Sequence, residues 1–297
     1  MTTNIYQTVT DRILKQLDAG VVPWRKTWTT GLPKSLNSGR DYRGVNTLVL
    51  GTTEFTSRYW VTYREAQRLG GHVRKGERAS PVIYWKWRTA EELAKRREAT
   101  GRDDLAPCVP FTSAVFNLDQ VEGVARPEDD VPHQANERFD VAEGILAAMP
   151  DKPEIVHQVT AQPAYSPRLD RITLPHLSQF ESAAEYYATL WHELVHSTGS
   201  SKRLNRFGEV EGDRFERYSI EELVAEFGAA FLCALTGVAN ASTDALQASY
   251  INGWAAALRK DVRLVLRAAS AAQRAVDYIR GQVAVPEHAP DPVAVNA

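Results

Sequence analysis

The sequence predicts an α+β protein of two domains, with an N-terminal α+β domain and a C-terminal, mainly helical one. The first observation is charge: residues 1–126 hold 20 Lys and Arg against 13 Asp and Glu, a net of +7, whereas residues 127–297 hold 15 against 24, a net of −9. The second is the junction, where two prolines and three consecutive acids at 127–132 indicate an exposed linker. The third is patterning, because helical periodicity dominates after the junction while helices and strands alternate before it.

The chain of 297 residues is long enough for two domains with their own apolar cores. No apolar run approaches the roughly 18 residues of a membrane span, and no secretory signal is visible at the N-terminus. The two cysteines, Cys108 and Cys233, have no metal-binding spacing, so we expect free thiols and a cytoplasmic protein that meets no membrane. The expected organisation is a basic domain over 1–126, a linker over 127–136, a second domain over 137–282 and a disordered tail over 283–297.

The elements of the basic half follow in order from local patterns. Apolar residues at helical spacing predict a first helix that ends at Gly20. A short helix is expected over 62–69, strands over 81–87 and 114–118, and a charged, solvated helical insertion over 91–102 between those strands. The apolar residues of the first helix are Ile5, Val9, Ile13, Leu14 and Leu17.

Aromatic side chains interleaved with cations in this half favour binding of single-stranded nucleic acid. Bases can stack on indole or phenol rings, and Lys or Arg can follow the phosphates. A Trp after Pro is also often a core anchor, and RNA would suit the same residues as DNA. The candidate DNA-binding residues are Trp24, Arg25, Lys26, Trp28, Arg40, Tyr42, Arg43, Arg74, Lys75 and Arg78.

The acidic half contains the HExxH pattern of zinc peptidases at residues 192–196. On a helix, His192 and His196 lie one turn apart on the same face, so both imidazoles can reach one metal ion. Glu193 lies beside the open side of that site and is the candidate general base, placed to take a proton from water. We expect this helix over 179–197, with Ser178 and Glu181 as a capping box at its start.

A third ligand has to come from elsewhere, because no His follows at the short spacing of the metzincin pattern. A second helix is expected over 219–232, and its segment 222–226 resembles the ExxA-plus-acid pattern of gluzincin peptidases. That resemblance makes Glu222 the candidate metal ligand and Glu226 the acid that supports a ligating His. The two roles are exchangeable, and Glu222 could instead cap the helix with Ser219. The expected cofactor is a divalent metal, Zn²⁺ in the first place, with Mn²⁺ or another ion as alternatives.

The segment 164–175 before the metal helix reads as a strand or hairpin, where zincin-like proteins place the edge strand of their cleft. Together these motifs resemble the ArdC antirestriction family of conjugative plasmids over most of the chain. The matching stretches are 5–28, 39–46, 59–66, 73–77 and 115–120 in the first half, and Tyr165, Asp170, Ile172, Leu174-Pro175, 192–199, Arg203-Leu204 and 221–231 in the second.

This resemblance implies an N-terminal domain that binds single-stranded DNA, a zincin-like metallopeptidase fold of gluzincin type behind it, and protection of incoming plasmid DNA from restriction. It implies single-stranded DNA as partner, with a host restriction enzyme or another DNA-bound protein as a candidate target. Two alternatives stay open. One is a metalloprotease that depends on single-stranded DNA and cleaves DNA-bound proteins, and the other is a binding protein whose metal is structural.

Overall fold

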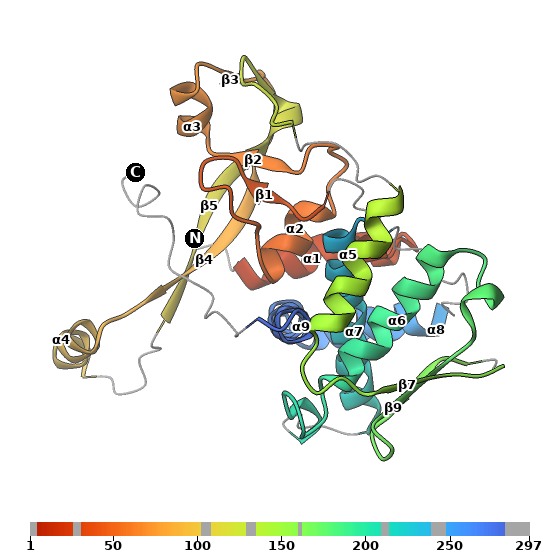
Figure 1. Cartoon of the computed structure of the whole chain (residues 1–297). Helices are drawn as coiled ribbons and strands as arrows, with labels where there is room; N and C mark the ends of the chain where they lie inside the picture. The colour runs from red at the N-terminus through yellow and green to blue at the C-terminus, as the bar shows by residue number, and fades with distance from the viewer. Residues whose placement is uncertain are drawn as a thin grey trace.

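The structure is a computed structural model of the whole chain, and it describes residues 5–25, 31–101, 108–128, 135–159, 162–208, 214–238 and 248–282. Within these ranges, the N-terminal part builds a mixed sheet and the C-terminal part a helical body with a small sheet (Figure 1). The predicted tail over 283–297 lies outside the described residues. No helix among the residues described is both long and apolar enough to cross a membrane.

The N-terminal part contains a four-stranded sheet of order β1-β2-β5-β4, on which α2 and α3 pack, and a separate β3–β6 pair. Strands β1 and β2 run parallel, and the other neighbours are antiparallel. In chain order the elements are α1 (Ile5–Asp18), η1 (Pro23–Arg25), β1 (Lys34–Ser35), α2 (Val45–Gly51), β2 (Tyr59–Val61), α3 (Tyr63–Arg68), β3 (His72–Val73), β4 (Ser80–Trp87), α4 (Ala90–Thr100), β5 (Cys108–Asn117), η2 (Leu118–Gln120) and β6 (Val121–Glu122).

Local sequence signals explain the bounds of these elements. Val9, Ile13, Leu14 and Leu17 of the predicted stripe of α1 are buried, and Gly20 follows the helix with a left-handed φ of 75°. Helix α3 starts at a capping box in which Thr62 and Glu65 satisfy each other's backbone N–H groups. The expected charged insertion is helix α4, which buries none of its residues.

Within the described residues, the C-terminal part packs five helices, α5 to α9, with a three-stranded sheet of order β7-β9-β8. Strand β8 is therefore an edge strand, and the predicted hairpin is confirmed as β8 and β9. The elements are α5 (Ala135–Ala148), β7 (Glu154–His157), β8 (Ala164–Ser166), β9 (Arg171–Leu174), η3 (Leu177–Gln179), α6 (Ala183–Ser197), η4 (Arg206–Gly208), α7 (Arg214–Thr236), α8 (Ala248–Lys260) and α9 (Leu264–Ile279).

Several predicted boundaries differ from the observed ones: the strand expected over 114–118 is β5 and begins at Cys108, and the helix expected over 219–232 is α7 and runs from Arg214 to Thr236. The metal helix α6 begins at Ala183, because Ser182 and not Ser178 accepts the backbone N–H of the residue three positions on, Glu185. The sequence repeats Ser-x-x-Glu at both places, so the local signal does not choose between them. Helix α5 begins at Ala135, inside the range expected to be linker.

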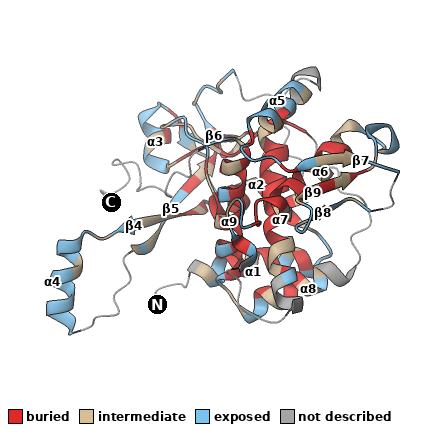
Figure 2. Cartoon of the chain, turned by 60° about the horizontal axis from the view of Figure 1, so that its bottom comes forward, coloured by how far each residue is buried: buried red, intermediate tan, exposed pale blue. Residues whose placement is uncertain are grey.

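The main apolar core is continuous between the two parts of the chain. Helix α1 packs on α8 and α9, η1 packs on α7, and α2 packs on α9. One cluster of buried side chains therefore runs from Val9 in α1 to Ile279 in α9, with a smaller cluster beneath α3. Figure 2 shows the buried residues concentrated where these helices meet. Since the N-terminal helices lie against α7 and α9, they help to fix the helices that carry the candidate site.

Candidate metal centre

Helices α6 and α7 approach each other closely where the candidate ligands lie. Leu190, Leu194 and Val195 bury the apolar side of α6. Gly228 of α7 faces Val195, and a Cβ built at this glycine would come within 2.6 Å of a Val195 methyl group. Any larger residue would therefore force the helices apart. The glycine sets the spacing across which side chains of the two helices can share one ion.

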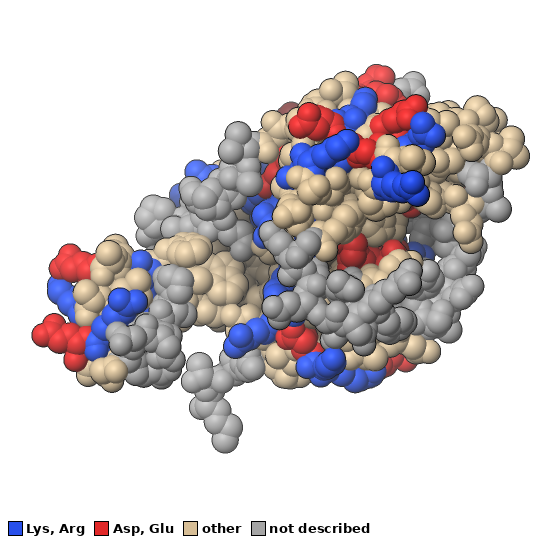
Figure 3. Space-filling view, turned by 90° about the horizontal axis from the view of Figure 1, so that it is seen from below, with Lys and Arg blue, Asp and Glu red and all other residues tan. Residues whose placement is uncertain are grey.

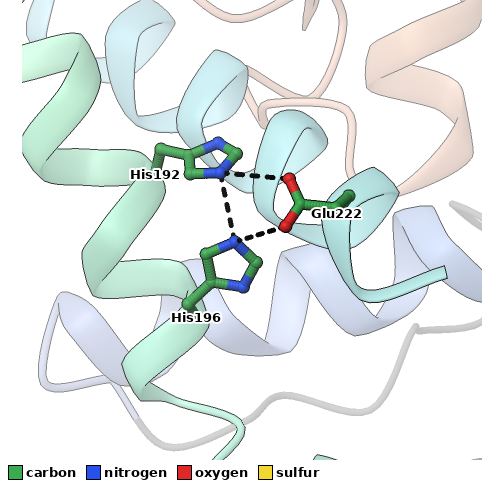
Figure 4. Close-up of side chains that lie close together, drawn as sticks. All are labelled: His192, His196 and Glu222. Carbon is green, nitrogen blue, oxygen red and sulfur yellow. Dashed lines mark hydrogen bonds and ion pairs between the residues drawn. The ribbon is translucent and has the colours of Figure 1, made fainter. Parts of the chain in front are cut away.

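Three side chains from these helices converge on one point (Figure 4). The Nε2 atoms of His192 and His196 are 3.1 Å apart, and Glu222 places one oxygen 3.5 Å from the first and the other 3.4 Å from the second. Ligand atoms about 2.0–2.1 Å from one tetrahedral ion lie about 3.3 Å from each other. The observed spacing thus fits two imidazoles and a carboxylate around a single divalent cation.

The electrostatics of this cluster favour a cation. Burial alone would lower the pKa of His196, but the carboxylates of Glu221 and Glu222 outweigh burial and raise this pKa to about 10. Burial would raise the pKa of Glu222, but its hydrogen bonds with His192 and His196 lower it overall. In the absence of an ion, a proton on His196 supplies the positive charge that these carboxylates demand. A divalent cation would meet the same demand with its own charge.

Glu221 and Arg206 form a support that the sequence prediction missed. Glu221 lies 3.4 Å from Nδ1 of His196, on the side away from Glu222. Buried Arg206 donates to both oxygens of Glu221, at 2.9 and 2.6 Å, and also to Thr198 and to the carbonyl of Val195. A carboxylate on the second nitrogen of a ligating His fixes its tautomer and ring orientation. Glu221 is next to Glu222 in the sequence, but no local signal pointed to Arg206.

Glu226 lies one turn after Glu222, between the N-terminal segment and His192. Its carboxylate accepts hydrogen bonds from Trp24 at 3.1 Å and from Arg25 at 2.9 and 3.3 Å. It lies 3.9 Å from Nδ1 of His192, too far for a hydrogen bond. The structure thus groups Glu222 with the two histidines as candidate ligands, whereas the carboxylate of Glu226 pairs with Arg25.

Glu193 is buried and held by the edge strand. Its carboxylate accepts the backbone N–H of Tyr165 in β8 at 2.7 Å. The phenol of Tyr165 donates to Asp170, which Arg203 also contacts at 2.8 Å. This chain of contacts fixes β8 against α6 and holds the carboxylate of the candidate general base in place.

Several residues predicted to bind DNA instead lie between the two parts of the chain. Trp24 has 0% of its surface exposed and packs edge-on against Phe227 of α7 and Trp254 of α8. Tyr42 is also buried. Neither ring has a face open to a base, so the prediction that they stack on DNA is wrong for this structure. The physical reason is that the large apolar ring of Trp24, which follows Pro23, is buried between Phe227 of α7 and Trp254 of α8.

The adjacent cations are paired across the same boundary. Arg25 pairs with Glu226, and Arg43 pairs with Asp277 of α9, whose exposed fraction is 2%. Gly44 adds a backbone hydrogen bond to Gln273 of α9 at 3.0 Å. These two arginines neutralise acids of the C-terminal part, of which Asp277 is buried, so they do not form part of the proposed DNA surface.

The remaining predicted DNA-binding residues divide into two groups. Arg40, Arg74, Lys75 and Arg78 are exposed, and Arg74 pairs with its neighbour Glu77 at 2.7 Å. The predicted contacts at Lys26 and Trp28 lie outside the described residues.

A metal helix with HExxH, an acid from the next helix and an edge strand beside the cluster define a zincin-like protein. A family model for a zincin-like metallopeptidase matches residues 141–271, and a model for the N-terminal domain of anti-restriction factor ArdC matches residues 3–116. A crystal structure of the antirestriction ArdC protein from R388 plasmid, in metal-free form, is 36% identical, with a TM-score of 0.75, and the match covers 93% of this chain and 97% of that one. The chain belongs to the ArdC antirestriction family.

The chain is also similar to a second structure of the R388 protein and to two further bacterial proteins. The Mn(II)-bound structure of the same R388 protein matches at 35% identity with a TM-score of 0.74 over the same shares of both chains. An uncharacterized protein of Sinorhizobium fredii, y4eC, is 34% identical over 94% of this chain and 92% of its own length. The DNA primase TraC of Escherichia coli is 34% identical over 92% of this chain, which spans only 27% of the primase.

Proposed function

We propose that this protein binds single-stranded DNA and protects incoming plasmid DNA from restriction, and that its zincin-like part holds one divalent metal. The observation that carries this proposal is the match, over nearly the whole of both chains, to the antirestriction protein from R388 plasmid. Likeness over the full length includes the N-terminal part and the helix pair with its three candidate ligands. The proposed role places the protein in the cytoplasm, where a transferred strand meets restriction enzymes.

On the DNA side, the exposed cations of the N-terminal part support the proposal. Arg40, Arg74, Lys75 and Arg78 present charge to solvent on the half of the chain with a net charge of +7. Such cations attract a phosphate backbone without reading its sequence. We therefore expect binding that weakens with salt and shows little sequence preference.

On the metal side, His192, His196 and Glu222 would hold the ion. Two imidazoles and one carboxylate suit Zn²⁺, and the Mn(II)-bound structure of the R388 protein makes Mn²⁺ the other ion to test. Once bound, the cation would act as a Lewis acid toward a peptide carbonyl. Glu193 would take a proton from an attacking water, and β8 would line the cleft.

The test is conjugative transfer of an unmodified plasmid into a restricting recipient that expresses this chain. We expect transfer to rise toward the level of a non-restricting recipient, and unchanged restriction would contradict the antirestriction role. Glu193→Gln keeps the shape of the side chain and removes the base. Full protection by this variant would assign protection to binding alone, whereas lost protection with retained metal and DNA binding would assign it to hydrolysis.

The intact HExxH motif favours a second candidate function. The protein would be a protease that is activated by single-stranded DNA and cleaves proteins bound to DNA, a host restriction enzyme among them. This function predicts cleavage of a DNA-bound test protein only when single strands and metal are both present. Cleavage that also occurs without DNA would contradict it, as would Glu193→Gln cleaving at the wild-type rate.

A further inference from the structure

A two-stranded ribbon, formed by β4 with Arg88 and by β5, projects from the N-terminal sheet and carries α4 beyond its end (Figure 1). Its strands pair without interruption from Ser80 opposite Val115 to Trp87 opposite Cys108. The inner end packs on the main core through buried Val82 and Ile83. The outer end is exposed, as Figure 2 shows for this arm.

The outer end presents the indole ring of Trp87 and the side chain of Val109 to solvent. Trp87 is 56% exposed, and it is the only exposed tryptophan among the residues that the structure describes. Three residues inward, and on the opposite face of the ribbon, the partly buried rings of Tyr84 and Phe111 form a stacked cross-strand pair with centroids 5.5 Å apart. Lys86 lies opposite Val109, and both are exposed. More than half of the surface of Trp87 is open to solvent, so a flat apolar group has access to its indole ring.

The charge of this ribbon indicates which class of molecule it binds. Residues 80–88 and 108–117 contain two cations, Lys86 and Arg88, and no Asp or Glu. Helix α4 differs, because it mixes acids with cations, and Lys95 pairs there with Glu91 at 2.7 Å. Figure 3 shows both signs of charge side by side at that end of the arm. A surface of rings and cations without acids complements a polyanion that offers flat apolar faces.

Single-stranded DNA has this chemistry. Its bases expose their π-faces, which a duplex hides by stacking, and its phosphates need nearby cations. A protein partner would fit the apolar rings, but a ribbon without acids gives no complement to the Lys and Arg of a typical protein surface. The absence of negative charge therefore favours DNA over protein as the occupant.

We propose that the outer end of this ribbon is a base-stacking surface for single-stranded DNA, with Trp87 against a base and Lys86, the residue before it, against a phosphate. This inference rests on the proposed function, because it locates the DNA contact on this fold. It replaces Trp24 and Tyr42, whose rings are buried, by the ring of Trp87, which solvent can reach.

The experiment is a titration of a fluorescein-labelled oligothymidylate with the full-length protein across a salt series. Loss of one stacked base costs on the order of tenfold in affinity, so Trp87→Ala should bind about tenfold more weakly. Trp87→Phe keeps a ring and should bind near the wild-type level. Lys86→Gln should lower the salt slope by about 0.7, the share of one phosphate contact on a single strand. Trp87 and Lys86 are both exposed, so we expect these variants to fold.

The matched control is Lys95→Gln, an exposed cation on α4 just beyond the ribbon, and it should leave binding unchanged. If wild type binds and Trp87→Ala binds equally well, the ribbon inference is overturned while DNA binding stands. If Trp87→Ala binds DNA as wild type does but loses protection in the transfer assay, the ribbon binds a protein partner instead. If wild type fails to bind even at low salt, the proposed function itself fails, and the ribbon inference fails with it.

Discussion

Replacement of Glu221 by Gln tests whether this carboxylate both braces a buried arginine and supports a metal ligand. Arg206 is buried and donates to both oxygens of Glu221. The attraction between charges about 4 Å apart is about 4 kcal/mol at an effective dielectric constant near 20. A glutamine carbonyl would recover about 1 kcal/mol as a neutral hydrogen bond. We therefore expect the free energy of unfolding of the metal-free protein to fall by about 3 kcal/mol.

The same substitution should weaken metal binding, because Gln cannot offer His196 a charged acceptor at Nδ1. Loss of such a support costs about 10- to 100-fold in metal affinity. Urea unfolding in chelator measures the first effect, and calorimetric titration with Zn²⁺ and with Mn²⁺ measures the second. Glu98→Gln on exposed α4 is the control and should change neither quantity. A destabilised Glu221→Gln protein with metal affinity within about twofold of wild type would refute the supporting role.

Three further substitutions test the packing that holds the site. Trp24→Ala should lower the free energy of unfolding by about 3–5 kcal/mol in urea titrations, as expected for a fully buried ring; a change of a few tenths would contradict its place in the core. Gly228→Ala should cost about 1–3 kcal/mol and weaken metal binding, because the added methyl collides with Val195; unchanged stability would show that the helices can separate freely. Hydrogen bonds from Arg203 lower the pKa of Asp170 from 3.8 to about 2, so its carboxylate stabilises the fold above pH 4 and loses this effect as pH falls toward 2. Asp170→Asn, which suits the left-handed φ of 51° there, should therefore be less stable by about 1 kcal/mol at pH 7, and the gap from wild type should close toward pH 2 rather than widen.

The metal cluster was accessible from the sequence because most of its information is local. The i, i+4 spacing of His192 and His196 places both imidazoles on one helix face whatever the rest of the fold does. The third position needed only a second amphipathic helix with acids near its start, and the structure brings Glu222 of that helix to both histidines. Its neighbour Glu221 was not distinguished, because its role depends on Arg206 in a separate segment.

The DNA-binding prediction was less successful for a physical reason. Trp and Arg side chains can stack on bases and pair with phosphates, or fill a core and neutralise a buried acid, and composition alone does not separate these outcomes. Arg25 pairs with Glu226 of α7, 201 residues further along the chain, and Arg43 pairs with Asp277 of α9, 234 residues further along. Only the tertiary structure reveals such partners. The ribbon was predicted as strands, but the exposure of Trp87 also required the fold.

The most direct test of the account is a crystal structure of the full-length protein soaked with Zn²⁺ or Mn²⁺, with anomalous data collected at the edge of that metal. The account predicts one anomalous peak bound by Nε2 of His192, Nε2 of His196 and the carboxylate of Glu222, while Glu226 keeps its contacts with Arg25 and Trp24. A peak bound by Glu226 in place of Glu222, or no peak between the two histidines, would contradict it.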